Sequence, residues 1–145
     1  MTHALAFTLC NFFVLPGWLL LVFAPRWKWS ATLVAPVLIP AVLAAIYLVL
    51  IVSSAGTTEG SFTSLDGVAS LFEDPTVLLA GWLHYLAFDL FIGSWEVRDS
   101  ARAGLGHAFV VPCLVLTFLF GPIGLLLYLG LRTWKHEAPL DTTAS

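Results

Sequence analysis

The sequence predicts an all-α membrane protein: a four-transmembrane-helix bundle with a short interfacial helix between spans two and three. Of its 145 residues, 59% are hydrophobic and only 10% are charged, whereas a soluble domain averages roughly 45–50% apolar and 25% charged residues. So few charges cannot cover so much apolar surface in water. Four apolar runs reach the length of about 20 residues that a helix needs to cross a bilayer. We therefore expect a single membrane bundle over residues 1–135 and a polar tail over 136–145.

The predicted spans are recognised by their ends as well as by their length. The first ends at an aromatic and basic stretch, 24–29, of the kind found at membrane interfaces. Ser30 is a suitable N-cap for the second span, and Asp74-Pro75 supplies an N-cap and a first-turn proline for the third. The fourth contains a Gly121-Pro122 pair. The spans expected are about residues 4–23, 31–52, 75–95 and 107–131.

Between the second and third spans, residues 53–74 are polar, with four acids and no Lys or Arg. Apolar side chains recur there at helical spacing, at Phe62, Leu65, Val68, Ala69 and Phe72. This pattern predicts a short amphipathic helix that lies on the membrane surface.

Charge limits both the partners and the orientation. The net charge of −3 provides no basic patch, so nucleic acid is not an expected partner, whereas membrane lipid is. With four spans, placing the first and third connections in the cytoplasm puts four Lys and Arg residues inside and leaves Arg132 and Lys135 outside. The positive-inside rule then weakly favours both termini outside. No internal repeat is visible, which argues against an inverted-repeat transporter.

The third span carries two ionisable residues at hydrocarbon depth, His84 and Asp89. Burying such a group costs roughly 2.5 kcal/mol or more, so it normally has a partner or a function. On an ideal helix the two lie about 140° apart around the axis and about 7.5 Å apart along it. They cannot bond to each other, so they face different helices or line opposite walls of one cleft.

Structural and functional roles are both open for this pair. His84 either bonds to a polar group of a facing helix or acts in catalysis. Asp89 is either a neutral carboxyl that donates a hydrogen bond, or it pairs with His84 of a second protomer in a homo-oligomer. Aromatic side chains around them either line a groove for a carotenoid or isoprenoid or are ordinary core. Those named as substrate-binding candidates are Trp82, Tyr85 and Phe88.

Four charged residues follow at the membrane edge: Glu96, Arg98, Asp99 and Arg102. We expect them to form a structural polar network in a loop over residues 96–106, with Asp99 and Arg102 as an ion pair. No metal or cofactor is expected. His3, His107 and His136 lie at membrane edges while His84 is central, which argues against bis-histidine haem ligation, and there is no repeated Glu-x-x-His of the kind that forms a di-iron site. Cys10 and Cys113 are interpreted as small apolar residues at helix contacts.

The order of motifs resembles the abscisic-acid-deficient-type membrane proteins, whose plant members take part in neoxanthin synthesis. The matching pieces run from Val14-Leu15-Pro16 to Gly121-Pro122-Ile123-Gly124, and the most specific is Trp82-x-His84 with Asp89-Leu90-Phe91. One departure is Ser94, where many relatives carry an arginine. No plastid-targeting region precedes the first span, so a bacterial inner membrane is the expected location.

The resemblance implies a cofactor-independent isomerase that acts on an epoxycarotenoid or related isoprenoid, or an accessory protein of that pathway. In the plant-type reaction an epoxide opens and a neighbouring carbon loses a proton, which requires a general acid and a base. Under this hypothesis Asp89 is the acid and His84 the base. The alternative is a non-catalytic membrane scaffold in which both residues only fix helix packing.

Overall fold

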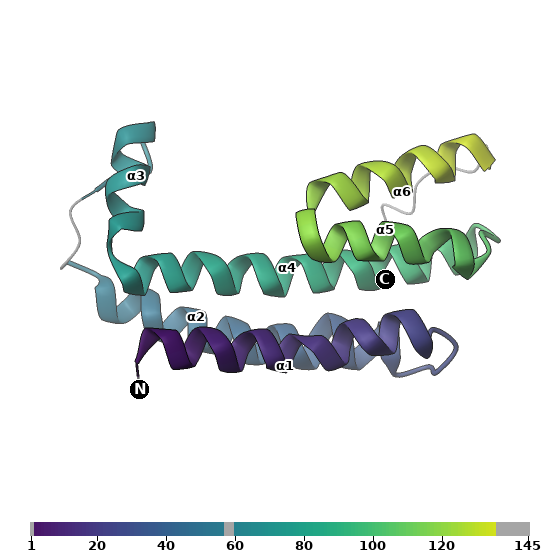
Figure 1. The fold of residues 1–145 in the computed structure, drawn as a ribbon, viewed down its shortest axis with the longest axis horizontal. Helices are drawn as coiled ribbons and strands as arrows, with labels where there is room; N and C mark the ends of the chain where they lie inside the picture. Colours follow the sequence, from purple (N-terminus) through teal and green to yellow (C-terminus); the bar gives the residue numbers. More distant parts are fainter. Residues whose placement is uncertain (1, 57–59, 136–145) are drawn as a thin grey trace.

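The computed structural model describes residues 2–56 and 60–135, and the predicted tail over 136–145 lies outside this part. Every regular element in the described residues is a helix (Figure 1). In chain order the helices are α1 (His3–Phe23), η1 (Ser30–Leu38), α2 (Ile39–Ser54), α3 (Leu65–Glu73), α4 (Pro75–Arg102), α5 (His107–Phe120) and α6 (Pro122–Lys135).

Three helical segments of the described chain are long and apolar enough to cross a membrane: α1, the continuous η1–α2 segment and α4, with 21, 25 and 28 residues. They pack side by side, with a buried core between them (Figure 1). Their outer surface stays apolar: Phe12 is 67% exposed and Leu48 is 61% exposed. Such a surface is stable against lipid and not against water. The first three predicted spans are therefore confirmed as apolar helices of spanning length, and the chain is a membrane protein.

The second span begins with a π-helix, η1, that contains Pro36. η1 is a π-helix in which the Val34 N–H donates to the Trp29 carbonyl, 2.8 Å away and five residues earlier. In this pattern the Ala31 carbonyl would accept from residue 36, but Pro36 has no N–H. Arg98 of α4 takes that place, because its Nη1 donates to the Ala31 carbonyl at 2.5 Å. The guanidinium thereby joins the second and third spans.

The predicted fourth span is not confirmed, because the chain turns back in its middle. Gly121 has a φ of 50° and a ψ of −98°, a backbone conformation that residues other than glycine rarely adopt. α5 and α6, each of 14 residues, run antiparallel on either side of it (Figure 1). Each is about 21 Å long, which is shorter than the hydrocarbon core of about 30 Å. The two helices form a hairpin that enters and leaves at the same end of the molecule.

The expected charged loop over 96–106 is also mostly helical. α4 continues to Arg102, so that only residues 103–106 connect it to α5. Glu96 and Asp99 accordingly lie on a helix beside the hairpin and are buried, instead of being solvated at a membrane edge. The expectation of a loop is wrong here, because α5 and α6 pack on this part of α4 and supply hydrogen-bond partners to Asp99 and to one oxygen of Glu96.

A short helix, α3, forms where amphipathic spacing predicted one. The Ser64 side chain caps it by accepting from the Gly67 N–H at 3.1 Å. Asp74 then caps α4 by accepting from the Thr76 N–H at 2.6 Å, and this hydrogen bond lowers the pKa of Asp74. α3 stands crosswise to α4 (Figure 1). Its position on a membrane surface stays a prediction.

The hairpin brings all six Lys and Arg residues to one end of the molecule (Figure 1). They occupy the α1–η1 connection, the last two turns of α4 and the last turn of α6: Arg26, Lys28, Arg98, Arg102, Arg132 and Lys135. The opposite end, around α3, carries the acids Asp66, Glu73 and Asp74. The four-span interpretation placed four Lys and Arg residues on one side of the membrane and two on the other. The structure instead places all six at one end and none at the opposite end.

We expect the basic end to face the cytoplasm and the termini to lie on opposite sides of the membrane. Green fluorescent protein fused after Lys135 should fluoresce, while alkaline phosphatase at the same place should be inactive. After Gly56, in the connection from α2 to α3, alkaline phosphatase should be active. Active phosphatase at both places would instead support four complete spans with both termini outside.

Candidate functional site

A stripe of polar side chains runs along the face of α4 that the α5–α6 hairpin covers. Its members are one or two helical turns apart and so share one face of the helix: Tyr85, Asp89, Glu96 and Asp99. Glu96 and Asp99 are 0% and 2% exposed, while Tyr85 and Asp89 are partly buried. The hairpin is therefore built against the polar side of a membrane-spanning helix.

The base of the hairpin is held by an ion pair. Asp99 accepts from Arg132 Nε at 2.5 Å and from Arg132 Nη2 at 3.3 Å, and the Tyr128 hydroxyl donates to it at 2.6 Å. All three side chains are buried. Tyr128 and Arg132 lie one turn apart on α6, so both reach the same carboxylate. A buried carboxylate with this set of donors can stay charged, and it fixes α6 to α4.

Glu96 has a different environment. Thr117 Oγ1 of α5 donates to its Oε1 at 2.9 Å, whereas its Oε2 is buried with no hydrogen-bond partner among the described residues. α6 approaches α5 closely here, because a Cβ on Gly124 would collide with the backbone nitrogen of Thr117. A charged carboxylate with one hydroxyl donor and no cation would be very costly in such surroundings. The neutral form of Glu96 fits this site.

At the tip of the hairpin, Asp89 lies beside the break between α5 and α6. A Cβ on Gly121 would lie 2.9 Å from Asp89 Oδ1, so glycine is required by the close approach as well as by its φ. The Tyr85 hydroxyl, which donates to the Phe118 carbonyl at 3.2 Å, is next to the Asp89 carboxyl. Asp89 Oδ2 is buried without a hydrogen-bond partner in the described part of the chain.

The structure does not bring His84 to Asp89. As the helical geometry predicted, the two face different helices: Asp89 meets the hairpin tip, and His84 lies near Tyr47 of α2, 6.1 Å between ring centroids. His84 is exposed on the outer surface, where its ring stacks on Phe88 at 4.4 Å. No neighbouring helix of the described chain therefore covers His84, and a catalytic role for it stays a prediction.

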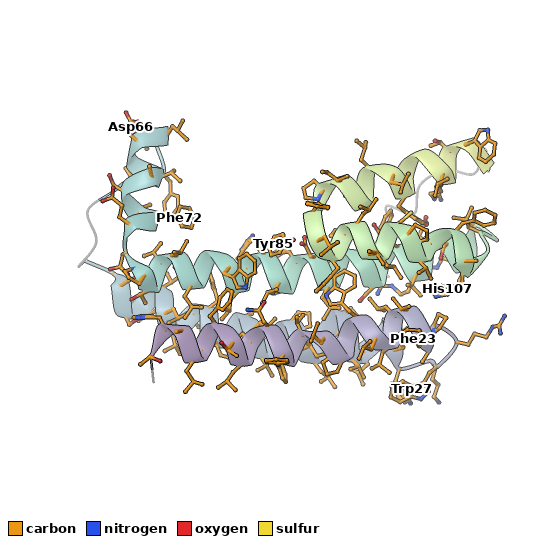
Figure 2. The ribbon with its side chains drawn as sticks, in the orientation of Figure 1. Phe23, Trp27, Asp66, Phe72, Tyr85 and His107 are labelled. Atoms are coloured by element: carbon orange, nitrogen blue, oxygen red, sulfur yellow. The ribbon has the colours of Figure 1, made fainter. Side chains whose placement is uncertain are left out.

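The predicted aromatic group is divided in the same way. Trp82 and Tyr85 belong to one cluster, with Phe7 of α1 at 5.3 Å from the Trp82 ring. The Trp82 Nε1 donates to Asn11 Oδ1 at 3.3 Å, which ties the cluster to α1. Phe88 is 56% exposed and belongs with His84 on the other face. Figure 2 shows Tyr85 projecting from α4 between α3 and the hairpin.

The remaining charged residues of the predicted network have separate positions. Arg98 bonds to the Ala31 carbonyl, and Arg102 is exposed at the end of α4.

The sequence reasoning missed Thr117, Tyr128 and Arg132, since they come from a run interpreted as a single span. The Gly121-Pro122 pair in that run was the available signal for a break. Among the described residues no three His, Cys, Asp or Glu side chains are placed to hold a metal ion.

The fold and the site together define a polytopic helical membrane protein with a hairpin closed over a buried polar network. The chain matches the ABA4-like family model, described as ABA DEFICIENT 4-like, over residues 5–128, and it belongs to that family. The match extends from the first turn of α1 to Tyr128 of α6, so it includes every residue of the hairpin tip. Comparisons with curated proteins and with solved structures gave no match.

Asp99→Asn should destabilise the protein strongly, because it removes the carboxylate charge that the buried Arg132 guanidinium contacts. We expect a loss of about 3–5 kcal/mol in the free energy of unfolding, measured by denaturant titration in detergent micelles. Asp66→Asn, the same change at an exposed aspartate of α3, is the control and should change it by less than about 0.5 kcal/mol. The double variant Asp99→Leu with Arg132→Met should recover most of the loss, since no buried charge remains. Wild-type stability of Asp99→Asn would refute the role of this ion pair.

Glu96→Gln should be tolerated, because glutamine reproduces the shape and the neutral charge of a protonated glutamate. The same titration should give a change of less than about 1 kcal/mol, since the Thr117 hydrogen bond is kept. Glu96→Ala should cost at least about 2 kcal/mol, because it leaves a cavity and an unpaired hydroxyl. A large loss in Glu96→Gln would mean that Glu96 is charged and has a cationic partner.

Proposed function

We infer that this ABA4-like protein is an acid/base isomerase of an epoxycarotenoid or related isoprenoid, and that Asp89 is its proton donor. The observation that carries the proposal is the buried, unpartnered Oδ2 of Asp89 at the tip of the hairpin. A carboxyl near the middle of a spanning helix, in an apolar environment, holds its proton and can deliver it to a weakly basic oxygen. Tyr85 stands next to the carboxyl, while its hydroxyl donates to the Phe118 carbonyl.

The reaction needs one proton to be added and one to be removed. The carboxyl gives its proton to the epoxide oxygen as the carbon–oxygen bond breaks, and a neighbouring carbon loses a proton as the new double bond forms. The carboxylate left on Asp89 can accept that second proton, because it has two oxygens and the two sites on the substrate are close together. Atoms and charges then balance, the enzyme returns to its first state, and the reaction uses no redox cofactor.

The substrate would reach Asp89 from the lipid on the side of Trp82 and Tyr85. Trp82 is 38% exposed and continues the aromatic surface formed with Phe7. Flat aromatic rings provide a suitable contact for a polyene. His84 and Phe88 are left out of the proposed site because they lie on another face of α4. The proposed location is the inner membrane of a bacterium.

A second candidate function is that of a non-catalytic scaffold, and it is favoured by the ion pair at the base of the hairpin. Asp99, Arg132 and Tyr128 bond to one another and have a purely structural explanation. If Asp89 and Tyr85 serve only to seat the hairpin tip, the polar stripe is a packing device throughout. Expression with a candidate substrate separates these alternatives.

Expressed in cells that accumulate violaxanthin, the wild-type protein should produce an allenic isomer that pigment chromatography detects. Asp89→Asn should lower the amount formed per folded protein by about 10²–10⁴-fold, since the amide cannot donate an acidic proton. Tyr85→Phe should lower it less. The folded amount is measured by size-exclusion chromatography of the solubilised protein.

His84→Gln is the matched control, since it changes an ionisable side chain on another face of the same helix. It should form product at the wild-type rate. Loss of product in His84→Gln with unchanged product in Asp89→Asn would overturn the assignment of the acid. Absence of product in the wild type, with Asp89→Asn unable to fold, would support the scaffold.

A further inference from the structure

A hollow opens at the basic end of the molecule, away from Asp89. It has a volume of about 660 Å³ and is enclosed by the α1–η1 connection, the end of α4 and the start of α5. Figure 2 shows Phe23, Trp27 and His107 gathered at this end. The His107 Nε2 donates to the Val22 carbonyl at 3.0 Å, which closes one side of the hollow by linking α5 to α1.

The hollow has a positive lining. Arg26 supplies the positive charge, and none of the described residues that line the hollow is acidic. Asp99 lies at this end of α4, but it is buried and neutralised by Arg132. All six Lys and Arg residues of the chain are at the same end. An anion is therefore the complementary ligand for this hollow.

An apolar groove continues from the hollow into the membrane. It runs between α1 and α5, has a volume of about 230 Å³, and is lined by apolar side chains, among them Trp18 and Phe118. Val22 lines both the groove and the hollow, so the two are adjacent. Leu19 and Val115 on its walls are 56% and 47% exposed, which leaves the groove open to lipid.

We propose that the hollow and the groove together bind one anionic phospholipid. The phosphate lies in the hollow against Arg26, and one acyl chain lies in the groove against Trp18 and Val115. The polar hollow lies at the basic end and the apolar groove leads from it towards the middle of the membrane. This is the order of headgroup and acyl chain in a phospholipid of the leaflet at that end. The positive-inside rule assigns this end to the cytoplasmic side, and cytoplasmic leaflets are rich in anionic lipids.

Native mass spectrometry of the whole chain, with phosphatidylglycerol and phosphatidylcholine of identical acyl chains as probes, tests the proposal. The wild-type protein should retain one phosphatidylglycerol and bind it more tightly than phosphatidylcholine. Arg26→Gln should weaken phosphatidylglycerol binding by about fivefold, the effect of one cation at a membrane surface, and should leave phosphatidylcholine binding unchanged. Val115→Trp, which fills the groove, should weaken both.

Two matched controls keep the test specific. Lys28→Gln removes the same charge two residues from Arg26, outside the lining of the hollow, and should bind phosphatidylglycerol like the wild type. Leu119→Trp adds the same ring to an exposed position of α5 outside the groove and should also be neutral. Inorganic phosphate at the same concentration as the lipid should not displace the lipid, because phosphate has no acyl chain to bind in the groove.

Three results would overturn the proposal. Equal affinity for the two lipids would show that the headgroup charge is not recognised. Equal losses in Arg26→Gln and Lys28→Gln would show a diffuse attraction to the basic end without a defined site. Displacement of the lipid by inorganic phosphate would show that the groove contributes nothing.

Discussion

The ion pair between Asp99 and Arg132 is the constraint on which the rest of this structure depends. Both groups are buried in a membrane protein, where a lone charge is very costly, so each requires the other. They can meet only if α6 returns to the end of the molecule where α4 finishes. The Tyr128 hydroxyl adds a hydrogen bond from the same helix face. The hairpin follows from this requirement and from the turn at Gly121.

Closing the hairpin places a non-helical turn between α5 and α6 at mid-depth in the bundle. Backbone that is not helical is tolerated in a membrane only where protein covers it, and here α4 does so. The Tyr85 hydroxyl satisfies the Phe118 carbonyl near the end of α5, and the Asp89 carboxyl lies against Gly121. The same geometry that completes the backbone hydrogen bonds thus positions a carboxyl with a free oxygen. The proposed chemistry needs no element beyond those that the fold already requires.

The hairpin also divides the molecule into two unlike ends. Because α6 comes back beside α4, every Lys and Arg lies at one end, and the acids of α3 lie at the other. The hollow lined by Arg26 and His107 lies at the basic end. The proposed lipid headgroup site there and the proposed reaction at the hairpin tip use different polar residues.

The sequence by itself determined the class of protein, the family resemblance and the first three spans. Composition and run length suffice for these, because apolar length and the capping residue Asp74 act locally. The spacing on α4 also showed that His84 and Asp89 cannot bond to each other. What the tertiary structure decided was the partner of each polar group. A run that contains Gly121-Pro122 is long enough to cross the membrane or to turn back. Only the pairing of Asp99 with Arg132, residues 33 apart in the chain, distinguishes these, and pairing over that distance leaves no periodic pattern in the sequence.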